Sequence, residues 1–481
     1  MKSDRLLLNL ITAIVLLPLA SAHGESESFE DFVRARMEVH AVVGVSIALV
    51  ADGEIRTLPL GRERAGGPEV SADSLFQVGS VSKPVAAWVV MTLVEDGRLE
   101  LDAPVSNYLS RWQLPASDFA GEGVTVRRLL SHTAGLSLHG YPGFPEGEEI
   151  PSLEASLSGA TGGSGSVYLF QEPGAAFSYS GGGYTLLQLL VEEVTGQSFA
   201  DYARQALFAP LSMESSDYLP DAALRQRLVT PHGRRADPIV QHDFRAQAAA
   251  SLHSTAEDLA RFVLANLGAN SVLADETVAL MHRGVAPAGA DEIGLGFVLK
   301  RDGRIVGHSG SNRGWKANLQ FAPAEGRGIV ILTNAESGGA FAYEVLCRWD
   351  ELLGPAALRE DCAAYYDGVA TSQRQISAVA LLLLFVSAAL LIRVLLQRSR
   401  GKTQFAWPAS PWRRASLTLV LLALGIWGLA LYTPIGGYLV AGAWPYFPTI
   451  DYLPRGFRWL SAAAIGLLVT LAVSCCVGRR A

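Results

Sequence analysis

The chain has 481 residues, of which 49% are hydrophobic and 18% charged, and its formal net charge is −7. The charged share is below the roughly 25% of an average globular chain, and the mean hydropathy of +0.24 is high for a purely soluble protein. This composition excludes a disordered or polyelectrolyte protein and favours a membrane component.

The charge is divided between two parts of the chain. Residues 371–481 hold eleven basic residues and one acid, a net +10, whereas residues 1–370 hold 28 basic and 45 acidic residues, a net −17. An acidic front argues against nucleic acid as a partner, because phosphate binding needs a basic face.

Residues 1–22 have the plan of a secretory signal peptide. A basic start precedes an apolar run from Leu6 to Ala20, and Ala20-Ser21-Ala22 supplies the small residues of a cleavage site. The run is short for a span of about 20 residues, and Pro18 interrupts it, so cleavage is favoured over an uncleaved anchor helix.

Three apolar stretches near the C-terminus are long enough to cross a bilayer, which takes about 20 residues. We expect transmembrane helices at 375–397, 415–435 and 458–478. Soluble buried helices are the alternative, but three such stretches in succession with almost no acidic residues disfavour it.

The basic residues predict the orientation of these helices. Residues 393–414 carry six basic residues and no acid, and the tail ends in Arg479-Arg480. Loops rich in Lys and Arg stay inside the cell, so the 398–414 loop and the tail are expected in the cytoplasm and the 436–457 loop outside. The sequence thus predicts a bacterial inner-membrane protein whose front part is periplasmic or extracytoplasmic.

The four cysteines are too few for a disulfide scaffold and form no CxxC pair of the kind that binds zinc. Cys347 and Cys362 could pair in an oxidising compartment, and the sequence leaves this open. Cys475 and Cys476 are interpreted as apolar residues at the end of the last span rather than palmitoylation sites.

The front part is expected to form one mixed domain over residues 28–355, joined to the membrane helices by a linker at 356–374. Two early strands and a late antiparallel meander enclose a helical middle, which predicts a sheet whose chain ends come together with helices around it. Segment 140–166 is rich in Gly, Ser, Pro and Glu and is expected to be a long surface loop. Strands are predicted at 42–50, 55–60, 295–300, 304–308, 315–321 and 328–333, and helices at 80–96, 181–195, 255–267 and 341–353.

The first candidate for chemistry is Ser80-x-x-Lys83 at the start of a predicted helix. Pro84 is tolerated there because first-turn amides have no partner within the helix. Residues three apart share a helix face, which puts Lys83 beside the Ser80 hydroxyl. A serine needs an adjacent base to become a nucleophile, although S-x-x-K alone also fits a helix cap followed by a solvated lysine.

Two further segments support a catalytic site. Tyr179 precedes a glycine-rich helix start, and a phenol near a cation can act as a general base. His308, Gly310 and Ser311 lie on a predicted strand, where His308 could contact substrate or tune protonation and the Ser311 backbone could complete an oxyanion hole. The alternatives are a core tyrosine capping a turn and a histidine at a sheet edge.

The order of these motifs resembles the serine β-lactamase and penicillin-binding-protein superfamily, in its class C β-lactamase-like branch. Ser80-x-x-Lys83 matches the first motif in full, and His308-Ser309-Gly310 matches the H-x-G variant of the third. The segments 129–136, 173–180 and 254–259 also resemble the family, and the likeness covers about residues 30–355. It implies an α+β fold, an antiparallel sheet flanked by helices with an all-helical subregion, followed here by the three transmembrane helices.

The resemblance also implies a mechanism. Ser80 would form an acyl-enzyme, Lys83 and Tyr179 would move protons, and the backbone amides of Ser80 and Ser311 would hold the oxyanion. Gly181 stands where the family often has Asn, and His308 replaces a charged lysine, so attraction of a substrate carboxylate is expected to be weaker and to depend on pH. These departures fit esterases and D-aminopeptidases at least as well as β-lactamases.

His132 is expected to order a loop near the site rather than to act in catalysis. The absence of G-x-S-x-G and HExxH patterns gives no support to an α/β-hydrolase or a zinc protease, and no metal or cofactor is expected. The expected partners are a small-molecule or short-peptide substrate and the lipid bilayer. A non-hydrolytic penicillin-binding sensor that signals through the helices is the alternative, and a transporter is disfavoured because the spans hold no acid.

Overall fold

The computed structural model describes residues 28–159, 165–353, 359–401, 403–405, 407–408, 410–433, 435 and 456–479. The expected signal peptide and nearly all of the expected 436–457 loop lie outside these described residues.

An eight-stranded antiparallel sheet forms the centre of the front domain, in the order β2-β1-β12-β11-β10-β9-β8-β7. The N-terminal strand β1 pairs with the last strand β12, with Val45 opposite Thr333, so the two ends of the domain meet as predicted. The strands are β1 Gly44–Ala51, β2 Glu54–Gly61, β7 Ala286–Ala288, β8 Asp291–Ile293, β9 Val298–Lys300, β10 Ile305–Asn312, β11 Trp315–Ala322 and β12 Arg327–Thr333.

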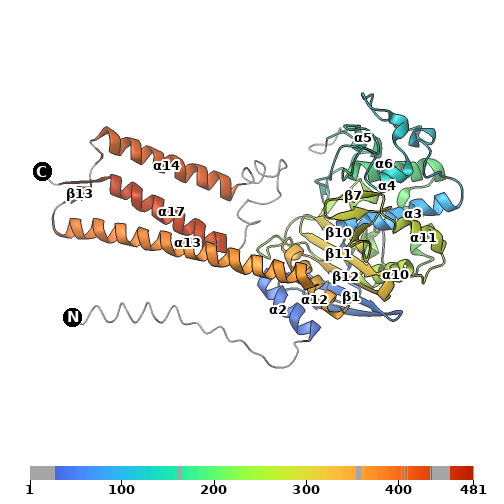
Figure 1. Cartoon of the computed structure of the whole chain (residues 1–481), viewed down its shortest axis with the longest axis horizontal. Helices are drawn as coiled ribbons and strands as arrows, with labels where there is room; N and C mark the ends of the chain where they lie inside the picture. The colour runs from blue at the N-terminus through green and yellow to red at the C-terminus, as the bar shows by residue number, and fades with distance from the viewer. Residues whose placement is uncertain are drawn as a thin grey trace.

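Both faces of the central strands are covered, which explains why β1 and β12 are almost continuously apolar. On one face, Ile47 and Ile331 pack with α2 (Phe29–His40) and α12 (Gly338–Leu352). On the other face, Ala48 and Val330 belong to a larger core that includes α10 (Ala256–Asn266). Figure 1 shows α2 and α12 close together at the sheet, next to β1.

The helical region holds the Ser80-x-x-Lys83 motif. Its longest members are α3 (Ser82–Glu95) and α6 (Gly181–Thr195). Helix α3 is apolar on nearly every side. It therefore runs through the core rather than along the surface, and most of its residues are buried. The other described members are η1 Gly79–Val81, η2 Val105–Asn107, η3 Gly121–Gly123, α4 Val126–Leu130, α5 Leu153–Leu157, α7 Phe199–Ala203, the π-helix η4 Arg204–Phe208, α8 Ala222–Arg225, α9 Gln247–Ala250, α10 Ala256–Asn266 and α11 Asp275–Met281, with η5 Pro323–Glu325 between strands.

Two-stranded pairings tie the helical region together. β3 (Phe76–Gln77) pairs with β6 (His253–Ser254), and β4 (Phe144–Pro145) pairs with β5 (His242–Asp243). The expected surface loop 140–166 therefore contains β4 and helix α5, and its residues 160–164 lie outside the described part of the chain.

Among the described residues, three helices are long and apolar enough to cross a bilayer, at Thr371–Ser399, Pro411–Tyr432 and Phe457–Cys475. They belong to α13 (Arg359–Ser399), α14 (Pro411–Tyr432) and α17 (Gly456–Cys475), and α17 contacts both of the others. The basic loop between the first two holds β13 (Thr403–Phe405), which pairs with β14 (Val477–Arg479).

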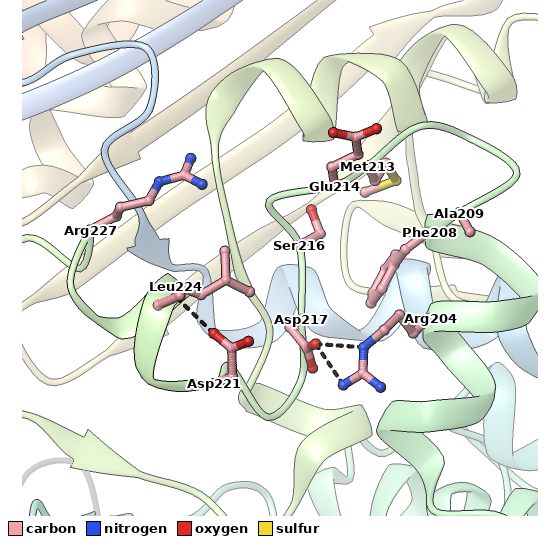
Figure 2. A pocket seen from close by; sticks show the side chains of 11 residues that line it. Arg204, Phe208, Ala209, Met213, Glu214, Ser216, Asp217, Asp221, Leu224 and Arg227 are labelled. Carbon is pink, nitrogen blue, oxygen red and sulfur yellow. Dashed lines mark hydrogen bonds and ion pairs between the residues drawn. The ribbon is translucent and has the colours of Figure 1, made fainter.

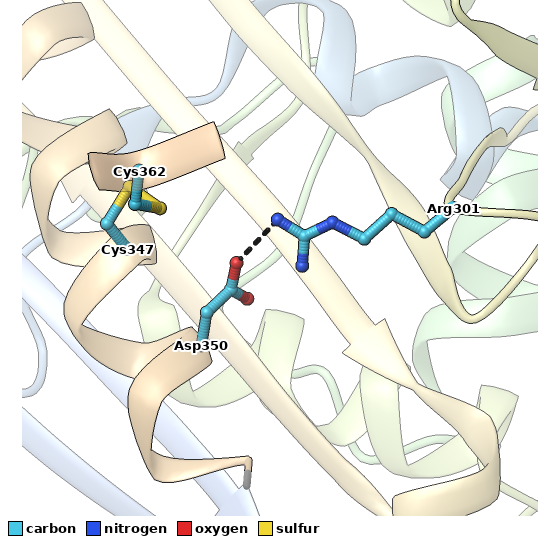
Figure 3. Close-up of a disulfide and its surroundings, with 4 residues drawn as sticks. All are labelled: Arg301, Cys347, Asp350 and Cys362. Carbon is cyan, nitrogen blue, oxygen red and sulfur yellow. Dashed lines mark ion pairs between the residues drawn. A yellow bond between two sulfur atoms is a disulfide. The ribbon is translucent and has the colours of Figure 1, made fainter. Parts of the chain in front are cut away.

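Within the expected linker 356–374, the chain is helical from Arg359 and continues without a break into the first apolar span. Many of the linker residues, such as Ala, Leu, Arg, Glu and Gln, are good helix formers, which favours a helix here. A Cys347–Cys362 disulfide joins α12 to α13, with Asp350 and Arg301 paired beside it at 2.9 Å (Figure 3).

Candidate active site

Ser80 and Lys83 meet at the start of α3. Ser80 lies in η1 and is half-buried, whereas Lys83, in the first turn of the helix, is only 2% exposed. The Lys83 Nζ donates hydrogen bonds to Ser80 Oγ at 3.1 Å and to the Ala249 carbonyl at 2.7 Å. The S-x-x-K spacing therefore produces the contact predicted from it, and one proton path links the hydroxyl to the buried amine.

Two glycines let the tip of strand β10 lie directly against this turn. A Cβ on Gly310 would come within 1.9 Å of the Val78 carbonyl, and one on Gly79 would come within 2.7 Å of the Ser311 nitrogen. The pairing between β10 and β9 ends at Gly307, so the rest of that strand edge faces η1. The structure thus places the Ser311 backbone N–H beside the nucleophile turn.

Tyr179 lies over the buried amine. Its ring centroid is 4.9 Å from Lys83 Nζ, and the ring is half-buried. The next residue, Ser180, caps α6 by accepting a hydrogen bond from the Gly183 N–H, which fixes the chain just after Tyr179. The structure therefore brings together the three residues expected to perform the chemistry.

His308 faces the same group from β10. Its ring centroid lies 6.1 Å from that of Tyr179, and its Nδ1 is 2.6 Å from the Ser309 carbonyl, so this nitrogen carries the proton. Nε2 is buried and has no hydrogen-bond partner among the described residues. Burial, and then the charge of Lys83, lower the pKa of His308 to about 3.

This geometry changes one expectation. The sequence predicted that His308 would attract a substrate carboxylate in a pH-dependent manner. With so low a pKa the imidazole stays neutral near neutral pH, so it supplies a hydrogen-bond acceptor rather than a titrating cation. The reason is burial by distant segments of the chain, which the H-x-G pattern does not reveal.

His132 orders the segment that carries Tyr179, as its loop-ordering interpretation predicts. The Ser180 N–H donates to His132 Nδ1 at 3.1 Å, and the Ser178 N–H donates to its carbonyl at 2.7 Å. The His132 and Tyr179 ring centroids are 4.3 Å apart, and a neighbouring imidazole, His139, lies 4.8 Å from the same ring. Burial keeps the pKa of His132 well below its usual value, so it too is neutral.

Several groups that contact the candidate site could not be identified from a sequence motif. The Ala249 carbonyl is a backbone group, which no side-chain pattern identifies. Lys316 donates to the Ser311 hydroxyl at 2.8 Å and is paired with Glu336, but neither residue belongs to a motif. Opposite positions in a hairpin identify such pairs only once the register is known.

No group of three or more His, Cys, Asp or Glu residues that could hold a metal ion occurs in the described part of the chain. A cavity of about 450 Å³ lies apart from the catalytic residues, between η4 and α8. Its Arg204 is paired with the buried Asp217 at 2.8 Å, as Figure 2 shows, and none of the catalytic residues lines it.

A serine is hydrogen-bonded to a buried lysine at the start of a helix, a tyrosine lies over the amine, and a strand backbone lies alongside. This arrangement is that of a serine hydrolase of the β-lactamase and transpeptidase fold. The chain belongs to this family: it matches the Beta-lactamase family over residues 29–345.

Two curated relatives show the range of activities in the family. Penicillin-binding protein 4 of Amycolatopsis lactamdurans is 31% identical over 365 residues, covering 71% of this chain and 91% of the relative. Esterase EstB of Burkholderia gladioli is 31% identical over 231 residues, covering 45% of this chain and 56% of the esterase.

Solved structures agree on the fold. A complex described as SurE with D-Leu has 25% identity and a TM-score of 0.56, covering 67% of this chain and 74% of SurE. A class C β-lactamase from Rhodobacter sphaeroides has 22% identity and a TM-score of 0.56, covering 67% of this chain and 99% of the enzyme. The predicted fold class is confirmed.

Proposed function

We propose that the protein is a membrane-anchored hydrolase that cleaves an amide or ester through an acyl-enzyme on Ser80. The observation that carries this proposal is the hydrogen bond between Lys83 Nζ and Ser80 Oγ, with Tyr179 over the same amine. The Ser80 hydroxyl contacts the buried amine, and the amine lies beside the phenol of Tyr179, so the Lys83 and Tyr179 pair can accept the hydroxyl proton and return it.

Each residue of the site has its own role in the proposed reaction. Ser80 Oγ attacks the substrate carbonyl and its proton passes to the Lys83 and Tyr179 pair, which returns it to the leaving amine or alcohol. The backbone N–H groups of Ser80 and Ser311 stabilise the oxyanion. A water molecule then attacks the ester carbonyl, its proton returns to Ser80 Oγ, and the acid is released.

Within this class we favour esters and the N-terminal D-amino-acid substrates of a D-aminopeptidase over β-lactam antibiotics. His308 is neutral, so the third motif offers no permanent cation to a carboxylate. Gly181 has no side-chain amide with which to hold an antibiotic side chain. The likeness to an esterase and to a D-leucine complex is compatible with this preference.

The test is a substrate panel on the full chain in detergent. It comprises a chromogenic ester, a chromogenic cephalosporin and a peptide ending in D-Ala-D-Ala. Turnover that falls by at least about 10⁴-fold in Ser80→Ala supports the proposal. Full activity in Ser80→Ala would refute it, and stoichiometric labelling of Ser80 without turnover would support a non-hydrolytic sensor instead. Ser117→Ala, at an exposed serine that bonds only within its own turn, is the matched control.

We also propose that the domain lies on the extracytoplasmic side of a bacterial inner membrane, with the C-terminus in the cytoplasm. The three apolar helices, the basic 398–414 loop and the disulfide support this orientation. Alkaline phosphatase, which is active only outside the cytoplasm, should be active when fused after residue 353 and inactive when fused after residue 481. The reverse pattern would refute the orientation.

A further inference from the structure

Lys316 occupies a braced position at the tip of the β10–β11 hairpin. It lies directly opposite Ser311 in the hairpin register. Its Nζ donates to Ser311 Oγ at 2.8 Å and to Glu336 Oε1 at 2.8 Å. The Lys316 side chain is 15% exposed and that of Glu336 only 5%, so the ion pair is largely withdrawn from water.

The Lys316–Glu336 ion pair, called the brace below, contacts three separate segments. Glu336 follows β12, and its second oxygen accepts a hydrogen bond from the Gly314 N–H in the hairpin turn at 2.9 Å. The Lys316 and Glu336 pair therefore connects the tip of β10, the turn and the segment after β12 through charged hydrogen bonds. Such bonds are about twice as strong as neutral ones, which favours a single geometry for the hairpin tip.

A second anchor holds the opposite side of the same tip. Asn312 Nδ2 donates to Gln77 Oε1 at 2.7 Å and to the Ala250 carbonyl at 3.0 Å. Ser311 therefore lies between two fixed neighbours, and its backbone nitrogen lies beside Gly79 and the nucleophile turn. A donor of this kind stabilises an oxyanion only when it is already in place before the reaction.

We propose that Lys316, paired with Glu336, is a positioning residue that holds the Ser311 N–H in line with Ser80 and never contacts substrate. The inference rests on the proposed function, and it assigns a positioning role to a residue that belongs to none of the three motifs. The charge balance supports positioning over substrate binding, because a carboxylate already neutralises the amine. Misplacement by about 1 Å at a reacting centre can cost about 100-fold in rate.

The test uses Lys316→Met and Lys316→Arg in the full chain in detergent, with a neutral chromogenic ester and a carboxylate-bearing cephalosporin or peptide. We expect Lys316→Met to lower kcat by about 10- to 100-fold on every substrate that is turned over, with KM changed less than about threefold. Lys316→Arg should recover part of kcat, since it restores a cation to the brace. Ser311→Ala, which removes the accepting hydroxyl but keeps the N–H, should show a smaller loss of kcat.

Lys300→Met is the matched control, because Lys300 is also a partly buried lysine of the sheet but lies on β9. The double variant Lys316→Met/Glu336→Met removes the stranded carboxylate, so a folded protein can be assayed if the single variant unfolds. Its thermal unfolding should resemble that of the Lys300→Met protein while its kcat stays low.

Two outcomes would overturn the inference. An unchanged kcat in both Lys316 variants would show that the brace has no effect on the reaction. A rise in KM confined to the carboxylate-bearing substrate would make Lys316 a substrate-binding residue instead. In either case activity that still depends on Ser80 leaves the proposed function intact, whereas activity that survives Ser80→Ala refutes the proposed function itself.

Discussion

The candidate active site combines the buried amine of Lys83 with neutral imidazoles. Lys83 is only 2% exposed, and the pKa values of His132 and His308 are lowered by burial and by the charge of this lysine. Burial of three charged groups in one place would carry a large desolvation cost, so neutral histidines are the favoured neighbours. The site is thus arranged around a single proton-transfer group, the Lys83 and Tyr179 pair.

The lowered pKa of His308 leads to a prediction about pH. A histidine with a pKa of about 3 is neutral above that pH, so its charge does not change between about pH 5 and 8. His308→Gln should therefore lower kcat/KM by about tenfold at every pH in this range, because one hydrogen-bond acceptor is altered. The inflections of the kcat/KM profile should not move.

The measurement is the kcat/KM profile of both proteins on a neutral ester. A wild-type inflection between pH 5 and 8 that disappears in His308→Gln would show that this histidine titrates there, contrary to its buried position.

At the same scale, the sequence predicts which candidate residues lie together better than it predicts their protonation states. Ser80, Lys83 and Tyr179 follow from motif order and from the three-residue spacing on a helix. The neutral form of His308 depends on burial by segments distant in sequence, and the part played by Lys316 depends on hairpin register. Neither property is local, so neither could be predicted from the motifs.

At the scale of elements, the junction between η1 and β10 is a contact of backbone against backbone. The two glycines at this contact leave room for no side chain, since a Cβ on Gly310 would lie 1.9 Å from the Val78 carbonyl. The glycine of the third motif therefore sets the distance between the nucleophile turn and the strand. Its role is steric and is independent of any contact with substrate.

Gly310→Ala should push β10 away from η1 and widen the oxyanion site. We expect kcat to fall by about 100-fold or more, because the Ser311 N–H would move by roughly 1 Å. Stability should fall by about 1–3 kcal/mol, the usual cost of overpacking. Steady-state kinetics and chemical unfolding of the purified chain measure the two effects.

Gly339→Ala provides the control for this change, because a Cβ at Gly339 in α12 meets no atom within 4 Å. Activity should be unchanged in that variant. Wild-type kcat in Gly310→Ala would mean that the strand does not need this close approach.

The elements themselves were predicted to different degrees. The long apolar strands β1, β11 and β12 and the helices α3, α6 and α10 were predicted nearly to their bounds. The short strands β7 and β8 were not predicted, since each has only three residues, too few for an alternating pattern, and β7 contains a proline. Pro287 in β7 is tolerated because this strand lies at the edge of the sheet.

At the scale of the whole molecule, one helix connects the domain to its apolar spans. α13 has 41 residues, so it extends for about 60 Å, of which residues 359–370 precede the apolar span. Figure 1 shows this helix running from beside α12 along α17. A continuous helix, unlike a flexible segment, couples the orientation of the apolar span to that of the residues that precede it.

The Cys347–Cys362 disulfide fixes the start of this helix to the domain. It joins residues 15 apart, and a hollow beside it is lined by Ile305, at the opposite end of β10 from Ser311. A cross-link over about 15 residues contributes about 3 kcal/mol by restricting the unfolded chain. Because the disulfide lies far from the nucleophile turn, we expect it to affect the stability of the domain but not the reaction at Ser80.

Removal of this disulfide should therefore destabilise the protein without changing its chemistry. We expect Cys347→Ser/Cys362→Ser to lose about 3 kcal/mol of stability and to keep wild-type kcat below its unfolding temperature. Reductant should lower the Tm of the wild type but leave that of the double variant unchanged. The control is Cys475→Ser/Cys476→Ser, which removes the two free cysteines and should respond to reductant like the wild type. Equal Tm values for oxidised and reduced wild type would show that packing of α13 against α12, rather than the covalent bond, holds the helix to the domain.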